Sequence, residues 1–285
     1  ASVTNIVLDL LFTGLFGWGV AGAALATVIG QAVSVIYSVL FLIKHKEEFY
    51  FDFKKGEFRP VKGNAGLLLK LGLPLMISGS AINISGLFVA RLVNQLGVSV
   101  SAAFGVGQKL SQIPNILTHA VGQALAAILG QNMGARQFSR VRRTVGVSIL
   151  ICGVIQIIFN VLCLSFAEFS FRIFTQDESV IAYAMSWNIA MAIGAAAMSC
   201  MPGFLTHIQA VGDTRVSMAI GLADAFVGRL LLTWLLGIVA GLGATGLFMG
   251  FTGGAYLSAI PAMCYYLFVP WEKRGLNKTL SEDAA

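Results

Sequence analysis

Long apolar segments alternate with short charged segments along this chain. Asp, Glu, Lys and Arg are absent from residues 10–43, 71–90, 110–135, 144–167, 179–212 and 230–271. A helix needs about 20 apolar residues to cross the hydrocarbon core of a bilayer, because each residue advances it by only about 1.5 Å. Glycine-containing breaks at 14–22 and 241–246 divide the first and the last segment. The pattern therefore predicts a partial span before Phe16 and then full spans near residues 20–43, 67–96, 101–131, 142–168, 179–209, 214–240 and 246–270.

The composition agrees with a lipid environment. Hydrophobic residues make up 57% of the 285 residues and charged residues only 11%, whereas about 25% of a soluble domain is charged. We therefore expect an all-α membrane protein, a polytopic bundle of transmembrane helices. The net charge of +6 falls in short bursts between neutral stretches rather than in one basic patch, so no nucleic-acid partner is expected.

Lys and Arg residues concentrate on alternate connections between the predicted spans. Of the 19 positive residues, 15 lie within 44–70, within 136–143, at 215 or after 272, and none lies within 97–100, 175–178 or 241–245. Short positive loops stay in the cytoplasm. The pattern predicts a multi-pass protein of the plasma membrane whose C-terminus is cytoplasmic.

A short glycine motif occurs twice, 224 positions apart. Residues 17–22 read GWGVAG and residues 241–246 read GLGATG, each between two apolar segments. A dinucleotide-binding turn of this type would follow a strand and precede an acidic residue by about 20 positions, which neither copy does; a tight turn between packed helices is the simpler interpretation. Transporters are commonly built from such repeats. We expect one complete six-helix lobe preceded by the last one and a half helices of another lobe, whose remainder would precede this chain.

One predicted span carries a polar stripe. Five polar residues at intervals of 4, 3, 4 and 4 share one helical face, and they are Gln108, Gln112, Asn115, His119 and Gln123. Burying each of these groups against lipid without a hydrogen-bond partner would cost about 1–3 kcal/mol of stability. Hydrogen bonding between packed helices is one explanation, but five polar groups are more than one helix–helix contact needs. We interpret the stripe as the lining of a water-filled cavity, with Asn83 and Asn188 as further candidates.

Asp224 is the only carboxylate in the middle of a predicted span of the complete lobe. Ionisable residues at such positions are candidates for function, so Asp224 is a candidate site for a coupling proton or cation; a structural ion pair is the alternative. Arg229 lies five positions further, about 140° around an α-helix, and cannot form the usual i,i+4 pair. Each is therefore expected to need a partner on another helix or a water molecule.

Signatures of enzymes are absent. The chain has no GxxxxGK[ST], HExxH or GxSxG motif, and its three histidines lie on separate segments. We expect no catalytic residues, no metal site and no cofactor.

Four segments, in order along essentially the whole chain, resemble the multidrug and toxic compound extrusion (MATE) transporters. They are 5–9 (NIVLD), 17–27 (GWGVAGAALAT), 130–135 (GQNMGA) followed by Arg140 and Arg142, and 174–178 (FTQDE). The resemblance implies a twelve-helix protein of two six-helix lobes that exports organic cations in exchange for protons or sodium ions. It divides the chain into the end of the N-lobe (1–43), a cytoplasmic linker between the lobes (44–65), the C-lobe (66–270) and a cytoplasmic tail (271–285).

One departure from the family limits this comparison. Some MATE branches carry cation-binding acids on the seventh and tenth helices, but here no Asp or Glu occurs within 58–167 or 179–212. The coupling acid would then be Asp224 or an acid of the missing N-lobe. The expected partners are organic cations, membrane lipids and that N-lobe.

A flippase for lipid-linked saccharides is the alternative function. It would favour an arginine-rich cavity for phosphate groups, whereas the stripe consists mainly of neutral amides.

Overall fold

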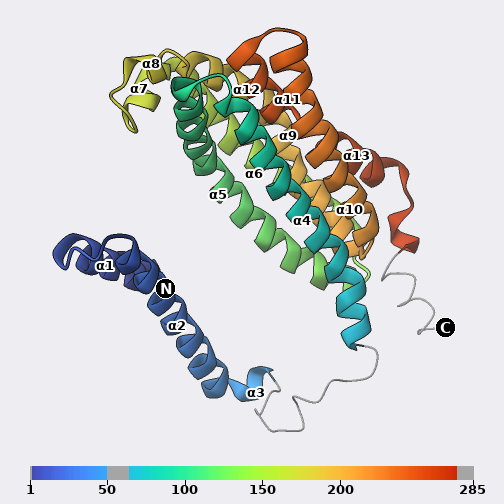
Figure 1. Ribbon diagram of the computed structural model, residues 1–285. Coiled ribbons are helices and arrows are strands. Elements are labelled where there is room, and N and C mark those ends of the chain that lie inside the picture. Colours follow the sequence, from blue (N-terminus) through green and yellow to red (C-terminus); the bar gives the residue numbers. More distant parts are fainter. Residues whose placement is uncertain (1, 50–63, 275–285) are drawn as a thin grey trace. The chain divides into compact units, whose positions relative to one another are not determined.

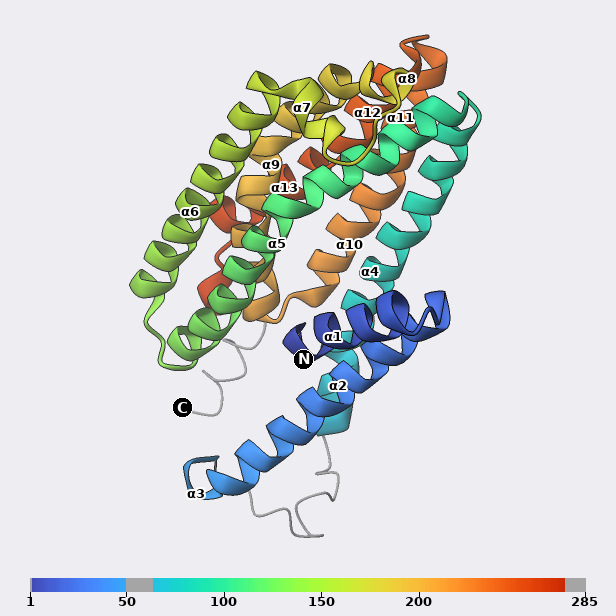
Figure 2. The same ribbon diagram turned by 90° about the vertical axis from the view of Figure 1, so that its left-hand side faces the viewer.

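The computed structural model describes residues 2–49 and 64–274, and within these ranges all regular structure is helical (Figures 1 and 2). Seven helical segments are long and apolar enough to cross a membrane. Their ends differ from the predicted spans by at most four residues, which confirms the expectation of an all-α, multi-pass membrane protein. Most of the predicted linker (residues 50–63) and most of the predicted tail (275–285) lie outside the described residues.

The chain divides into two compact units, residues 1–65 and 66–285. The first unit contains α1 (Ser2–Asp9), the π-helix η1 (Leu10–Leu15), α2 (Gly19–Lys44) and the short α3 (Lys46–Phe49). Between η1 and α2 the chain reverses in a tight turn at Gly17 and Gly19, whose φ angles of 66° and 52° fall in the left-handed region that glycine tolerates.

The second copy of the glycine motif forms the same kind of turn. Gly241 and Gly243, with φ angles of 71° and 57°, connect the π-helix η3 (Leu235–Val239) to α12 (Gly243–Gly253). A Cβ atom on Gly246 would lie 2.4 Å from the carbonyl oxygen of Leu236, so the two helices approach each other as only glycine permits. The motif is therefore a helix-to-helix turn in both copies.

The second unit is a bundle of long helices. Three of its spans are single helices, α4 (Asn64–Asn94), α5 (Val98–Gly134) and α6 (Phe138–Ser165). The next span combines α8 (Glu178–Ile181) with α9 (Ala184–Val211), after the short α7 (Ala167–Arg172). The last two spans are composite: α10 (Thr214–Ala223), η2 (Asp224–Leu231), α11 (Leu232–Trp234) and η3, then α12 and α13 (Tyr256–Phe268), followed by the 3₁₀ turn η4 (Trp271–Lys273).

Helix α9 is the centre of this bundle and packs against α5, α6, α12 and α13. Lipid tails are as apolar as the side chains, so close van der Waals packing at small residues holds such helices together. A Cβ atom on Gly107 of α5 would overlap the indole ring of Trp187, and one on Gly194 would lie 2.9 Å from the carbonyl oxygen of Thr252. These glycines bring α5 and α12 against α9.

The two ends of the bundle differ. The turns α5–α6 and α9–α10 and the segment η4 lie at one end, whereas α7, α8 and the turn from α4 to α5 lie at the other (Figures 1 and 2). One apolar core, around Phe104, Trp187 and Phe248, lies at the α7–α8 end, and a second, around Leu129, Ile208 and Trp271, lies at the opposite end. The polar stripe of α5 runs between these two cores.

Candidate functional site

All five residues of the polar stripe line two adjoining cavities in the second unit. Gln108, Gln112 and Asn115 line a cavity of about 170 Å³ beside Trp187, which we call the Trp187 cavity. Asn115, His119 and Gln123 line a second cavity of about 470 Å³, the His119 cavity. The two share Asn115, Met198 and Arg229 as lining residues. The stripe therefore faces open space along four turns of α5 rather than a dry helix seam.

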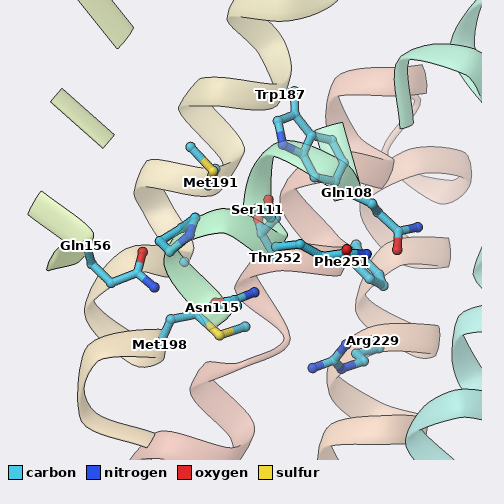
Figure 3. A pocket seen from close by; sticks show the side chains of 13 residues that line it. Gln108, Ser111, Asn115, Gln156, Trp187, Met191, Met198, Arg229, Phe251 and Thr252 are labelled. Carbon is cyan, nitrogen blue, oxygen red and sulfur yellow. The ribbon is translucent and has the colours of Figure 1, made fainter. Parts of the chain in front are cut away.

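The walls of the Trp187 cavity come from five elements. Opposite the stripe lie residues of α6, α9, η2 and α12, among them Gln156, Trp187, Met191, Arg229 and Thr252. In Figure 3 the amide of Gln156 and the guanidinium of Arg229 point toward the middle of the cavity from opposite sides. Met191, Met198 and Phe251 supply apolar surface between these polar groups.

Two buried polar atoms at the wall of this cavity have no hydrogen-bond partner among the described residues. They are the hydroxyl oxygen of Ser111 and the indole Nε1 of Trp187. Buried polar groups in folded proteins are nearly always satisfied by protein or by ordered water. These two groups are therefore available to a water molecule or a ligand in the cavity.

The other two amides of the predicted site lie away from both cavities. Asn83 is exposed on α4 and donates to the carbonyl oxygen of Gly79 in its own helix, at 2.9 Å. Asn188 is fully buried and donates to the carbonyl oxygen of Cys163 at 2.8 Å and to the hydroxyl of Ser170 at 3.3 Å. Asn188 thus links α9 to the end of α6 and to the short helix α7.

The expectation that Asp224 and Arg229 do not pair within one helix is wrong. Arg229 Nε lies 3.4 Å from Asp224 Oδ2, and the carboxylate is only 1% exposed. The reason is that residues 224–231 form a π-helix rather than an α-helix. In a π-helix the backbone hydrogen bonds join residues that are five apart in the sequence. Asp224 and Arg229 are five apart, so their side chains lie on the same face of η2.

Arg229 brings a charge to both cavities. It is the one Asp, Glu, Lys or Arg residue that lines either cavity in the described part of the chain, and its guanidinium carbon lies 5.4 Å from the centre of the Phe251 ring. Asp224 lies behind it, with Oδ1 free of hydrogen-bond partners among the described residues. Buried Ser258 of α13 is a second polar neighbour of this carboxylate. The arrangement is a buried ion pair with its cationic member facing the cavity.

Among the cavity residues that the sequence-based site does not include are Gln156, Trp187 and Arg229. Gln156 could have been noticed, because it is an amide in the otherwise apolar segment 144–167. Arg229 is an ionisable residue within the predicted span 214–240, which marks it as a candidate for function, but the sequence does not show that it faces the cavities, because its direction depends on the π-helix. Trp187 carries no such signal, since its position depends on the close approach at Gly107. Within residues 2–49 and 64–274, no group of three or more His, Cys, Asp or Glu side chains could hold a metal ion.

Comparison with known proteins gives consistent matches. A family model described as MatE matches residues 74–235. The probable multidrug resistance protein YpnP of Bacillus subtilis is 26% identical over 272 residues, which cover 95% of this chain and 60% of YpnP. The multidrug export protein MepA of Staphylococcus aureus is 21% identical over 177 residues, or 62% of this chain and 39% of MepA. These relatives are named as transport or resistance proteins, not as enzymes.

Solved structures share the fold. A crystal structure of MATE in complex with MaL6 superposes with a TM-score of 0.84 at 21% identity, covering 93% of this chain and 59% of that one. The bent form of the Vibrio cholerae MATE transporter VcmN gives a TM-score of 0.78 at 21% identity, with the same coverage. The chain thus spans about 60% of the length of YpnP and of these two structures.

Proposed function

Because this chain belongs to the MatE family, we propose that the protein containing it exports small organic cations in exchange for protons or sodium ions, by alternating access of two lobes. The observation that carries this proposal is that five polar residues of one membrane-spanning helix line two adjoining cavities. Polar lining at the depth of the bilayer is what a path for water-soluble molecules requires, since lipid would leave these groups unsatisfied.

The chemistry of the cavities suits varied organic cations. Trp187 and Phe251 offer aromatic rings, which attract cations through their faces. Met191 and Met198 are flexible and polarizable side chains that adapt to differently shaped ligands. The amides of Gln112 and Asn115 provide both hydrogen-bond donors and acceptors. A lipid-linked saccharide flippase would need several arginines for phosphate groups, whereas Arg229 is the one arginine lining these cavities in the described part of the chain.

The Asp224–Arg229 pair supplies a mechanism for exchange with protons. When Asp224 is ionised, its charge cancels that of Arg229 and the cavity can accept a cation. When Asp224 binds a proton, the positive charge of Arg229 is no longer balanced and a cationic substrate is repelled. Proton and substrate then bind antagonistically, which is the linkage that an antiporter needs. Arg229 also disfavours Na⁺ beside the same carboxylate, so we propose a proton at this site.

The role of the stripe is tested by transport of a cationic dye. In the full-length protein, Gln112→Ala and Asn115→Ala should each lower the initial rate of dye efflux from energised cells several-fold. Asn83→Ala is the matched control, since it removes an exposed amide outside both cavities. Efflux that is unchanged in both stripe variants, at equal amounts of protein in the membrane, would remove this cavity from the substrate path.

The coupling role is tested separately with Asp224→Asn in proteoliposomes. We expect loss of both pH-driven uptake and exchange of labelled for unlabelled dye, because the neutral side chain leaves the charge of Arg229 unbalanced and the cationic dye is repelled. Glu168→Gln, which alters a carboxylate that is 76% exposed, should leave both activities unchanged. Normal pH-driven transport by Asp224→Asn would instead place the coupling acid elsewhere in the full-length protein, as in the N-lobe alternative.

We also propose that the end of the bundle with the α5–α6 turn, the α9–α10 turn and η4 faces the cytoplasm of the cell. The start of α6, the start of α10 and η4 lie at this end (Figure 2), and they carry Arg140, Arg143, Arg215 and Lys273, as the positive-inside rule requires. After replacement of Cys264, a membrane-impermeant thiol reagent added to intact cells should label Val98→Cys and spare Lys273→Cys. The reverse labelling would invert the topology.

A further inference from the structure

A third pocket, separate from the two cavities, lies where α5 turns into α6. It has a volume of about 480 Å³ and is lined by Ile128, Gln131, Asn132, Ala135, Gln137, Arg140, Arg143 and Thr144. No acidic residue is among these lining residues, whereas two are arginines and three are amides. The pocket thus offers hydrogen-bond donors and positive charge, and it belongs to the end of the bundle where α5 turns into α6 (Figure 2).

The turn that builds this pocket is well ordered by its own hydrogen bonds. The backbone N–H of Gln137 donates to the carbonyl oxygen of Asn132 at 2.8 Å. The Gln137 side chain in turn accepts a hydrogen bond from Arg140 Nη1 at 2.8 Å. The guanidinium of Arg140 is therefore held at the pocket by an uncharged partner, and no carboxylate of the described residues pairs with it.

The three neighbouring arginines of α6 have different surroundings. Arg142 points to the other side of the helix, where its Nη2 lies 2.9 Å from Glu272 Oε1 and its guanidinium faces the Trp271 ring. Neither Arg140 nor Arg143 is ion-paired with a carboxylate in the described part of the chain. The charge at the pocket therefore comes from Arg140 and Arg143, while that of Arg142 is neutralised.

After Arg143, toward the middle of α6, the same face of the helix becomes entirely apolar. Positions at alternating intervals of 4 and 3 after Arg143 are between 47% and 67% exposed, and they are Val147, Leu150, Val154, Ile157 and Val161. These intervals keep all five on one helical face. A continuous apolar stripe, which we call the α6 stripe, thus leads from the charged pocket along the membrane-spanning part of the helix.

We propose that this pocket binds the phosphodiester headgroup of an anionic glycerophospholipid, with an acyl chain lying along the α6 stripe. Guanidinium groups form short, charge-assisted hydrogen bonds with phosphate oxygens, and basic pockets at the cytoplasmic side of membrane helices are suited to anionic headgroups. The charged pocket matches the headgroup of a lipid molecule, and the adjoining α6 stripe matches its acyl chain. The site does not depend on which compound the protein transports. It gives a role to residues 131–135 and Arg140, which the cavities leave unexplained.

The test compares lipids in thermal unfolding of the purified full-length protein in detergent. Phosphatidylglycerol at about 100 times its Kd should raise Tm by about 5 °C, and phosphatidylcholine should not. The double variant Arg140→Gln, Arg143→Gln should lose most of this rise. The control Arg215→Gln, Lys273→Gln removes two exposed charges from the same end of the bundle and should keep it.

Three results would overturn the proposal. One is an equal loss of the lipid effect in the control, which would indicate attraction to surface charge in general. Another is a full rise of Tm with inorganic phosphate or with glycerophosphoglycerol, the headgroup without acyl chains, which would indicate an anion site rather than a lipid site. The third is no difference between the two lipids on the wild-type protein, a comparison that needs no variant and therefore does not depend on the folding of the double variant.

Discussion

At the scale of single residues, glycines decide how closely the cavity walls approach one another. Gly228 of η2 is the sharpest example, because a Cβ atom there would lie 2.6 Å from the carbonyl oxygen of Gly254 and 3.1 Å from Asp224 Oδ1. The backbone of Gly254 cannot move aside as a flexible side chain would. We expect Gly228→Ala to destabilise the protein by about 1–3 kcal/mol through overpacking, measured by unfolding in SDS. Gly146→Ala is the control, since a Cβ atom there meets open space. Equal stability of the two variants would contradict the close contact.

A second residue-scale prediction concerns Asp177, which caps α8. The hydroxyl and the backbone N–H of Ser179 donate to Asp177 Oδ1 at 2.7 and 2.9 Å, and these hydrogen bonds lower the pKa of the carboxyl from its ordinary value of 3.8. A carboxyl with a lowered pKa stabilises the folded state above pH 3.8, and this contribution is lost as the pH falls through the folded pKa. Protection of the α8 amides from hydrogen exchange should therefore drop as the pH is lowered from neutral to below that ordinary value. In Asp177→Asn, whose amide oxygen still accepts but does not titrate, protection should not drop; the same loss in both proteins would exclude the cap as its cause.

At the scale of elements, the π-helix η2 creates the ion pair between Asp224 and Arg229. Removing one member leaves a buried charge without its partner, which costs about 3–5 kcal/mol. We expect Arg229→Gln to lower the unfolding free energy by roughly that amount. Asp224→Asn combined with Arg229→Gln should cost clearly less than the sum of the two single changes, because the pair is removed together. Additive costs in this double-mutant cycle, measured by reversible unfolding, would show that the two side chains do not interact.

At the scale of the whole second unit, the segment after α13 closes one end of the bundle. Trp271 is 2% exposed within the apolar core that also contains Leu129 and Ile208, and its ring lies 4.5 Å from that of His207. Trp271→Ala should destabilise the unit by about 3–5 kcal/mol, as loss of a buried aromatic side chain does. Phe268→Ala, at a site 79% exposed on the preceding helix, should change stability far less. Similar thermal stability of the two variants would refute this role of Trp271.

The sequence by itself determined the membrane-spanning helices, their approximate ends and the polar face of α5, because hydrophobicity and helical periodicity are local properties that the bilayer enforces. It could not determine that Asp224 forms an ion pair with Arg229. In an α-helix, side chains five residues apart point in different directions, and only the π-helical turn brings these two together. Nor could it place Asn188 in a buried bond to α6, or Trp187 and Arg229 at the cavities. Those positions depend on contacts between helices far apart in the chain, made possible by glycines whose neighbours only the tertiary structure supplies.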